Sequence, residues 1–340
     1  MKDFYSKCLL CPRACAVDRN AGRRGFCGET AELRIASASI HRGEEPPVTG
    51  AGGSGTIFIS GCNLGCVFCQ NYQISKNNPG GCMGRVVHTG EFAEICLALQ
   101  KLGAENINIV TGSHAAPAIA KGLVLAKERG LVIPVLWNSS GYEGMETLEI
   151  LKDLIDVYLP DLKTLDSGIA GRFFYAPDYP ENAKRAILKM MELRPLNFGP
   201  GRGGAAVMRS GVMIRHLVLP GCLEAAKEVL RWVSGNCTAA GHGAAGRALL
   251  SVMTQYTPLK PAAKEAPDRH VSEKEYDTIL GWLEELGIDD GFCQEPVSGS
   301  EWLPDFSRTN PFPSELSKPV WHWKSRWVIF EAFPKREPLV

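Results

Sequence analysis

Residues 55–75 read GTIFISGCNLGCVFCQNYQIS and decide more about this chain than any other stretch. They place Cys62, Cys66 and Cys69 in a C-x3-C-x2-C spacing directly after the apolar run 57–59. Three thiolates on one short loop can bind three irons of a four-iron cluster, because each cysteine ligates one iron. The fourth iron then lacks a protein ligand, and an open coordination position distinguishes a catalytic metal centre from a structural one. The spacing therefore predicts a [4Fe–4S] cluster with one open iron.

A zinc knuckle is the alternative interpretation of this loop. A closed zinc site would borrow a fourth ligand from elsewhere in the chain. Such sites usually pair their cysteines as two C-x2-C units. The C-x3-C-x2-C run does not have that form, so the cluster is the favoured interpretation.

The composition is typical of a soluble enzyme. Among the 340 residues there are 37 Lys or Arg and 37 Asp or Glu, so the formal net charge is zero. No overall electrostatic field therefore favours nucleic acid, a membrane surface or acidic partners. The sequence shows neither an apolar run long enough to span a membrane nor an N-terminal secretion signal. We therefore expect a cytoplasmic protein, in a reducing compartment where its twelve cysteines bind metal more often than they form disulfides.

The chain divides into three predicted parts. Residues 1–48 form a cysteine-rich segment with little apolar periodicity, residues 49–290 alternate strand and helix patterns, and residues 291–340 are rich in Pro, Trp and Phe. We expect the last part to be an irregular extension that packs on the central domain. Its aromatic side chains are expected to pack rather than to bind a ligand.

Six strand patterns alternate with helical ones in the central part. The strands are expected at residues 56–60, 106–110, 132–137, 156–160, 212–219 and 249–253. Such alternation predicts a parallel sheet with right-handed crossovers. Periodicity alone fits a doubly wound sheet equally well, but a cysteine loop after the first strand favours a partial (β/α)6 barrel. In barrels the chemistry collects on loops at the carboxyl ends of the strands.

Polar residues follow several of these strands, where packing does not explain them. We take Asp161 and Gln255 as candidate catalytic residues, and the candidate cofactor-binding residues at strand ends are Thr111, Ser113, His114, Asn138 and Lys163. Arg215 joins this group from inside the apolar strand VMIRHLVLP, where a charge needs a partner. If Arg215 faces the barrel interior, its planar fork suits a carboxylate ligand. The alternative is an internal ion pair with Asp161 or another strand acid.

Four further cysteines form a second candidate metal site. Cys8, Cys11, Cys15 and Cys27 have the spacing C-x2-C-x3-C-x11-C. They could hold a second iron–sulfur cluster, as an electron conduit or substrate anchor, or a structural zinc that tethers a segment too short for its own core. A third possibility is that only some of them bind metal.

The chain resembles the radical S-adenosylmethionine (radical SAM) proteins related to pyruvate formate-lyase activating enzyme, and most closely a branch with an N-terminal CLLCPRAC-like segment. The resemblance covers nearly the whole chain and is carried by residues 62–75, WNSSGYE (137–143), YLPDLK (158–163), IRHLVLPG (214–221) and MTQYTP (253–258). It implies the partial (β/α)6 barrel, a [4Fe–4S] cluster and S-adenosylmethionine (AdoMet) bound to its open iron. It also implies that Lys163 and Arg215 lie near AdoMet.

The resemblance further implies a reaction and partners. One-electron reduction of the cluster, by a donor such as flavodoxin or ferredoxin, would cleave AdoMet to a 5′-deoxyadenosyl radical that abstracts hydrogen. In activating enzymes the target is a glycine of a glycyl radical enzyme. The alternatives are radical modification of a small molecule or peptide and, more distantly, a scaffold that binds zinc or AdoMet without catalysis. Two departures weaken the link to a substrate: residues 111–114 replace the usual Gly-Gly-Glu segment, and Gln70 stands where His is common.

Overall fold

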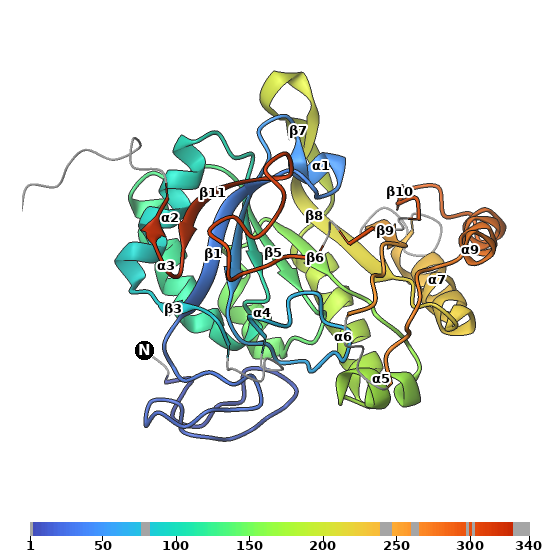
Figure 1. Cartoon of the computed structure of the whole chain (residues 1–340), viewed down its shortest axis with the longest axis horizontal. Coiled ribbons are helices and arrows are strands. Elements are labelled where there is room, and N and C mark those ends of the chain that lie inside the picture. Colours follow the sequence, from blue (N-terminus) through green and yellow to red (C-terminus); the bar gives the residue numbers. More distant parts are fainter. Residues whose placement is uncertain are drawn as a thin grey trace, which may run out of the picture.

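The computed structural model describes residues 3–75, 82–238, 247–259, 265–296, 299–300 and 303–328. They form one sheet with the strand order β10-β9-β8-β6-β5-β4-β2-β1-β11-β12 (Figure 1). Its centre consists of the parallel strands β2 (Ser54–Ile59), β4 (Ile107–Val110), β5 (Val135–Ser139), β6 (Val157–Pro160), β8 (Ala206–Leu217) and β9 (Leu249–Met253).

The order of the parallel strands follows the chain without reversal. A doubly wound sheet would reverse its order at a switch point, so this arrangement confirms the predicted α/β partial barrel. The connections contain the helices α2 (Thr89–Lys101), α3 (Ala116–Glu128), α4 (Met145–Leu151), α5 (Ser167–Phe174), α6 (Tyr179–Leu193) and α7 (Leu223–Cys237), and α9 (Glu273–Glu285) follows β9. Neighbouring helices contact one another in chain order, α2 with α3, α3 with α4 and α4 with α6.

The core lies between this helix layer and the sheet. Helix α6 buries Ala183, Ile187 and Met190, the face that the 3.6-residue spacing predicts. Helix α9 begins with the predicted capping box, in which Ser272 and Glu275 each bond the other's backbone N–H. Local sequence signals therefore account for most helix positions.

Two antiparallel strands extend the sheet beyond the six predicted ones. Strand β1 (Arg34–His41) lies inside the predicted segment 1–48 and pairs with β2. Strand β11 (Ser317–His322) lies inside the extension that was expected to be irregular, and it pairs with β1. Long-range pairing forms both, and periodicity within one segment cannot reveal it. The short elements are α1 (Pro46–Thr49), β3 (Arg85–Val86), β7 (Asn197–Pro200), β10 (Gly291–Cys293), β12 (Arg326–Trp327) and the 3-10 turns Ser113–Ala115 and Arg202–Gly204.

Residues 3–33 form turns without helix or strand and lie beside the barrel as the blue loops in Figure 1. Across the described parts of the chain, no helix is both long enough and apolar enough to cross a membrane. Residues 329–340 of the predicted extension lie outside the described residues.

Candidate active site

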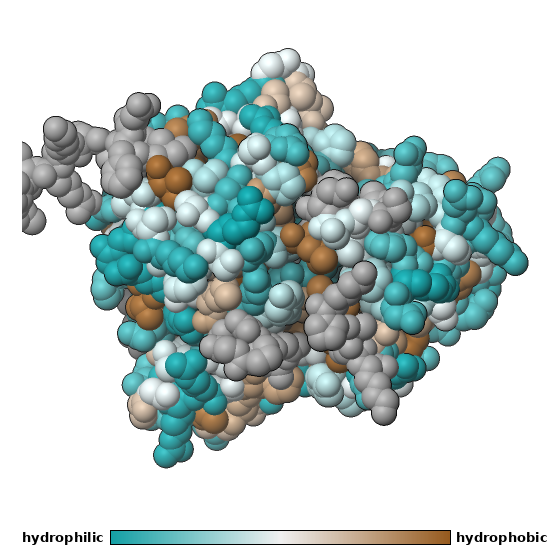
Figure 2. Space-filling model, in the orientation of Figure 1, coloured by the Kyte–Doolittle hydropathy of each residue, from teal (hydrophilic) through white to brown (hydrophobic). Residues whose placement is uncertain are grey.

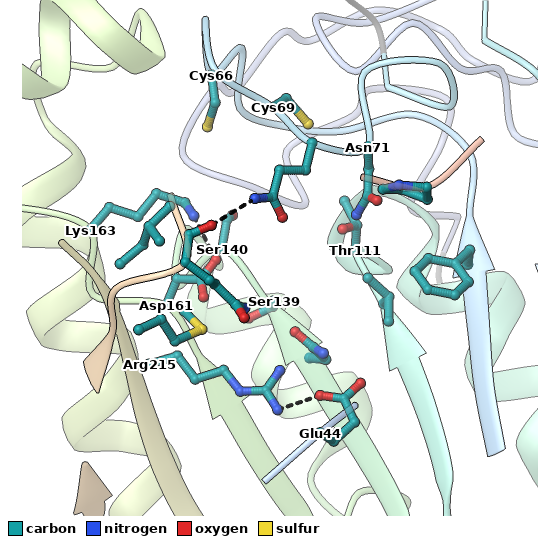
Figure 3. A pocket seen from close by; sticks show the side chains of 18 of the residues that line it. Glu44, Cys66, Cys69, Asn71, Thr111, Ser139, Ser140, Asp161, Lys163 and Arg215 are labelled. Atoms are coloured by element: carbon teal, nitrogen blue, oxygen red, sulfur yellow. Dashed lines mark hydrogen bonds and ion pairs between the residues drawn. The ribbon is translucent and has the colours of Figure 1, made fainter. Parts of the chain in front are cut away.

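A cavity of about 280 Å³ lies at the carboxyl ends of the parallel strands, next to the cysteine loop. In Figure 3, Cys66 and Cys69 lie at one end and the Arg215–Glu44 ion pair at the other. The predicted site residues that line the cavity are Cys62, Cys66, Cys69, Thr111, Asn138, Asp161, Lys163, Arg215 and Gln255. Side chains from separate strands thus meet in one place, as a barrel site requires.

Aromatic packing and the end of helix α5 hold the cysteine loop in position. The Phe68 ring packs edge-on against Phe173, Phe174 and Tyr256, with ring centroids 6.1, 5.9 and 5.7 Å away. The Val67 N–H donates to the Phe173 carbonyl at 3.0 Å, one of the last carbonyls of α5, which have no partner within the helix. The Gly65 N–H also donates to the Phe174 carbonyl at 3.4 Å, so the loop is anchored on both sides of Cys66.

The three cavity cysteines are free thiols. Burial raises the pKa of each one, to about 12 for Cys66. Among the described residues, no group of three His, Cys, Asp or Glu side chains converges closely enough to hold a single metal ion. Three thiols that line one cavity fit an iron–sulfur cluster, because each cysteine of such a cluster binds a different iron. Cluster binding would also fix the thiolate form against the burial that opposes it.

Lys163 and Asp161 form an ion pair within the cavity wall. The Lys163 Nζ lies 2.6 Å from Asp161 Oδ2. Burial alone would lower the pKa of Lys163, but Asp161 and Cys66 outweigh it and raise that pKa. Tyr179 fixes the turn between the two residues, since its hydroxyl donates to the Asp161 carbonyl at 2.8 Å and accepts from the Lys163 N–H at 3.0 Å. The Lys163 ammonium is thus held beside the three cysteines, where its charge partly offsets the rise that burial causes in the pKa of Cys66.

Thr111 has a strained backbone at the end of β4. Its φ is +64°, a left-handed conformation that costs a β-branched residue free energy. The Thr111 N–H donates to the Asn138 carbonyl at 2.8 Å, and both residues line the cavity. Strain of this kind concentrates at functional sites, where the surrounding structure enforces it.

Arg215 faces the barrel interior, but two glutamate side chains already accept hydrogen bonds from its guanidinium group. The Arg215 Nε donates to Glu45 Oε1 at 3.0 Å, while Nη2 donates to Glu45 Oε2 and, at 2.6 Å, to Glu44 Oε2. The structure thus contains an internal ion pair, as the alternative predicted, but its partners Glu44 and Glu45 come from the turn before α1 and not from a strand. Burial by itself would lower the pKa of Arg215, and the two glutamates raise it instead.

Ser113 and His114 turn away from the cavity in the described structure. The Ser113 hydroxyl donates to buried Glu143 at 2.6 Å. The His114 Nε2 lies 2.8 Å from the Ser60 carbonyl, and burial lowers the pKa of this histidine to about 3. Both side chains therefore support the loops around the site, and their predicted role in cofactor binding stays a prediction.

The N-terminal cysteines lie outside the cavity but touch its loop. Cys8 and Cys27 are buried, and Cys11 and Cys15 are half-buried. The carbonyl of Cys27 accepts a hydrogen bond from the Cys62 N–H at 3.3 Å. The second cysteine group is thus a direct neighbour of the first.

Several cavity residues were not predicted from the sequence. Glu44 and Glu45 come from the turn before α1, and Ser139, Ser140 and Phe312 also line the cavity. An acidic pair ahead of two prolines was visible in the sequence, but nothing local connects it with Arg215, some 170 residues later.

Comparison with known proteins supports these features. The model of the radical SAM superfamily matches residues 56–200. The uncharacterised protein MJ0674 of Methanocaldococcus jannaschii is 30% identical over 296 residues, which cover 85% of this chain and 77% of that protein. Another uncharacterised protein of that organism, MJ0808, is 25% identical over 181 residues, covering 48% of this chain and 51% of that protein.

Solved structures resemble the chain more weakly. SuiB of Streptococcus suis, bound to its precursor peptide SuiA, aligns with a TM-score of 0.48 at 14% identity. The alignment covers 69% of this chain and 46% of SuiB, so the chain spans less than half the length of that protein. A likeness at this score carries no weight for activity.

The family match begins in the first barrel strand and includes the whole cysteine loop. The relative that is 30% identical spans most of both chains. The family implies a [4Fe–4S] cluster and AdoMet. This chain belongs to the radical SAM superfamily.

Proposed function

We propose that this chain reductively cleaves AdoMet at a [4Fe–4S] cluster on Cys62, Cys66 and Cys69, and directs the 5′-deoxyadenosyl radical at a small molecule held in the barrel. One observation carries the proposal: the three thiols share a single cavity with the polar ends of the barrel strands. Cluster and AdoMet together supply the radical chemistry. The protein supplies orientation, charge and exclusion of water.

Lys163 is the best candidate for the AdoMet carboxylate. It lines the cavity with the cluster thiols, and only one of its three ammonium donors is needed for Asp161. Arg215 is less available, because a carboxylate would have to displace Glu44 or Glu45. Asn138 and Thr111 complete the polar wall between these two ends of the cavity.

The C-terminal extension favours a small substrate over a protein loop. Pro304 and Phe312 of this extension form part of the cavity wall. Gln73, at the end of the cysteine loop, ties the extension down: its amide donates to Asp305 at 3.1 Å and accepts from the Phe306 N–H at 2.7 Å. On the face in Figure 2, hydrophobic residues form small patches among hydrophilic ones. A glycyl radical enzyme would have to insert a loop past this wall.

The test is anaerobic reconstitution with iron and sulfide, followed by reduction with dithionite in the presence of AdoMet. We expect 5′-deoxyadenosine from the wild-type chain, none from Cys66→Ala, and undiminished product from the control Cys293→Ala, whose side chain lies on edge strand β10 outside the cavity. Zinc retention without 5′-deoxyadenosine would overturn the proposal. If hydrogen is transferred to the radical from a glycyl radical enzyme and from no small molecule, the chain is an activating enzyme and its substrate is a protein.

A further inference from the structure

The four N-terminal cysteines lie on loops that backbone hydrogen bonds hold together, without regular secondary structure. Residues 3–33 contain no helix or strand. The Cys8 N–H nevertheless donates to the Val17 carbonyl, and its own carbonyl accepts from the Ala16 N–H, both at 3.0 Å. Residues 11–14 form a tight turn, in which the Ala14 N–H donates to the Cys11 carbonyl at 3.0 Å. These backbone bonds bring Cys8, Cys11 and Cys15 onto adjoining turns, and together with Cys27 we call them the N-terminal quartet.

The backbone on both sides of Cys15 is strained, and a backbone N–H group bonds the Cys15 sulfur. Ala14 and Ala16, on either side, have φ values of +42° and +55°, which cost a non-glycine residue free energy. The Phe26 N–H donates to Cys15 Sγ at 3.3 Å, and Gly25 packs its backbone against the same sulfur. Backbone N–H groups aimed at cysteine sulfur stabilise a thiolate, as hydrogen bonds do in iron–sulfur proteins.

A buried cation faces this quartet. Arg19 is 1% exposed, and its guanidinium bonds the carbonyls of Thr30 and His114 and, at 3.6 Å, Cys8 Sγ. No carboxylate pairs with Arg19 among the described residues, where its side-chain hydrogen bonds go to two carbonyls and to Cys8 Sγ. A buried arginine is costly unless a negative charge compensates it. Four thiolates on a metal centre would provide that charge.

The quartet is bonded directly to the AdoMet-cluster loop. The Cys62 N–H donates to the Cys27 carbonyl, and Gly61 packs so closely there that a Cβ would lie 3.0 Å from that carbonyl. Arg13, between Cys11 and Cys15, donates from Nε to the Asn63 carbonyl at 2.9 Å and lies 3.6 Å over the Phe26 ring. A single backbone hydrogen bond therefore joins Cys27, a candidate ligand of the N-terminal site, to Cys62, a candidate ligand of the AdoMet cluster.

We propose that Cys8, Cys11, Cys15 and Cys27 bind a second [4Fe–4S] cluster, which relays electrons to the cluster on Cys62, Cys66 and Cys69. This inference rests on the proposed function. An external one-electron protein reductant of low potential reduces the N-terminal cluster by one electron. That cluster returns to its oxidised state when it reduces the AdoMet cluster, which passes the electron to the sulfonium. The direct bond between Cys27 and Cys62 favours a redox-active cluster over a structural zinc, because zinc cannot carry an electron.

The first test compares metal content in reconstituted full-length chains. The wild type should hold about eight irons and the Cys62→Ala/Cys66→Ala/Cys69→Ala variant about four. Its remaining cluster should give an electron paramagnetic resonance (EPR) signal that AdoMet does not change. Zinc, or no metal in a chain that melts like the wild type, would overturn the inference. The proposed function would survive that result, because it depends only on the other cluster.

The second test addresses the relay with Cys11→Ser. We expect AdoMet still to change the EPR signal of the remaining cluster, and 5′-deoxyadenosine to form with dithionite, which can reach that cluster directly. Reduction by photoreduced flavodoxin should lose most of its rate. An unchanged rate with flavodoxin would refute the relay. If Cys11→Ser does not fold, the iron content of the reconstituted wild type decides the point, since about four irons per chain would exclude the second site.

Discussion

Glu45→Gln removes one negative charge from the buried Arg215 ion pair and keeps the shape of the side chain. The two side chains are 8% and 3% exposed and share two hydrogen bonds. Breaking a buried pair costs about 3–5 kcal/mol, because the remaining charge is left uncompensated. Glu44, 2.6 Å from Arg215, still balances the guanidinium. We therefore expect the lower end, a loss of about 3 kcal/mol in the free energy of unfolding.

Urea unfolding, followed by tryptophan fluorescence, measures this loss in Glu45→Gln, Arg215→Met and the double variant. In the absence of Arg215, removal of the Glu45 charge should not destabilise the fold further. The free energy of unfolding of the double variant should therefore exceed the additive value by about 2 kcal/mol. Additive effects, within about 0.5 kcal/mol, would refute the ion pair and leave Arg215 free for a ligand carboxylate.

The same pair predicts a pH dependence. Burial would raise the pKa of Glu45, but Arg215 outweighs it and holds that pKa below the usual 4.5. The stability it contributes is therefore full above pH 4.5 and is lost as pH falls through the lower folded-state pKa. The free energy of unfolding of Glu45→Gln should fall less steeply below that pH than that of the wild type. Equal slopes would contradict the assignment.

Two further substitutions test the geometry of the site. Thr111→Gly should raise the free energy of unfolding by up to about 1 kcal/mol, because relief of the left-handed strain exceeds the entropy cost of glycine; a loss in urea unfolding would show that the Thr111 side chain contributes more than its backbone costs. Phe68→Ala should cost about 3–5 kcal/mol and reduce iron retention, because the ring anchors the cysteine loop. Its control, Phe198→Ala, removes a ring that is 39% exposed and should leave both quantities unchanged; equal iron loss in both variants would contradict the anchoring role.

The local signals in the sequence were sufficient for the barrel and for one end of its site. Most barrel strands are short apolar runs followed by a polar residue, so the sequence places Asn138, Asp161 and Lys163 near the strand ends. The spacing of Cys62, Cys66 and Cys69 needs no long-range information. These predictions hold because a parallel barrel brings consecutive strand ends together.

The other end of the site depends on contacts that no local pattern encodes. Glu44 and Glu45 reach Arg215 across about half the chain. Four of the eight residues of strand β1 are Ala or Ser, so its local hydrophobicity does not predict that it is almost wholly buried. His114 is buried against the Ser60 carbonyl, a contact across 54 residues that the local sequence does not predict.

The central claim is that three thiols leave one iron open to AdoMet. The most direct measurement is electron–nuclear double resonance of the reduced, reconstituted chain with AdoMet labelled with nitrogen-15 at its amino group. The account predicts a nitrogen-15 coupling to the cluster in the wild type and in Cys11→Ser, and none in Cys66→Ala. A reduced cluster without any nitrogen-15 coupling in the wild type would contradict it.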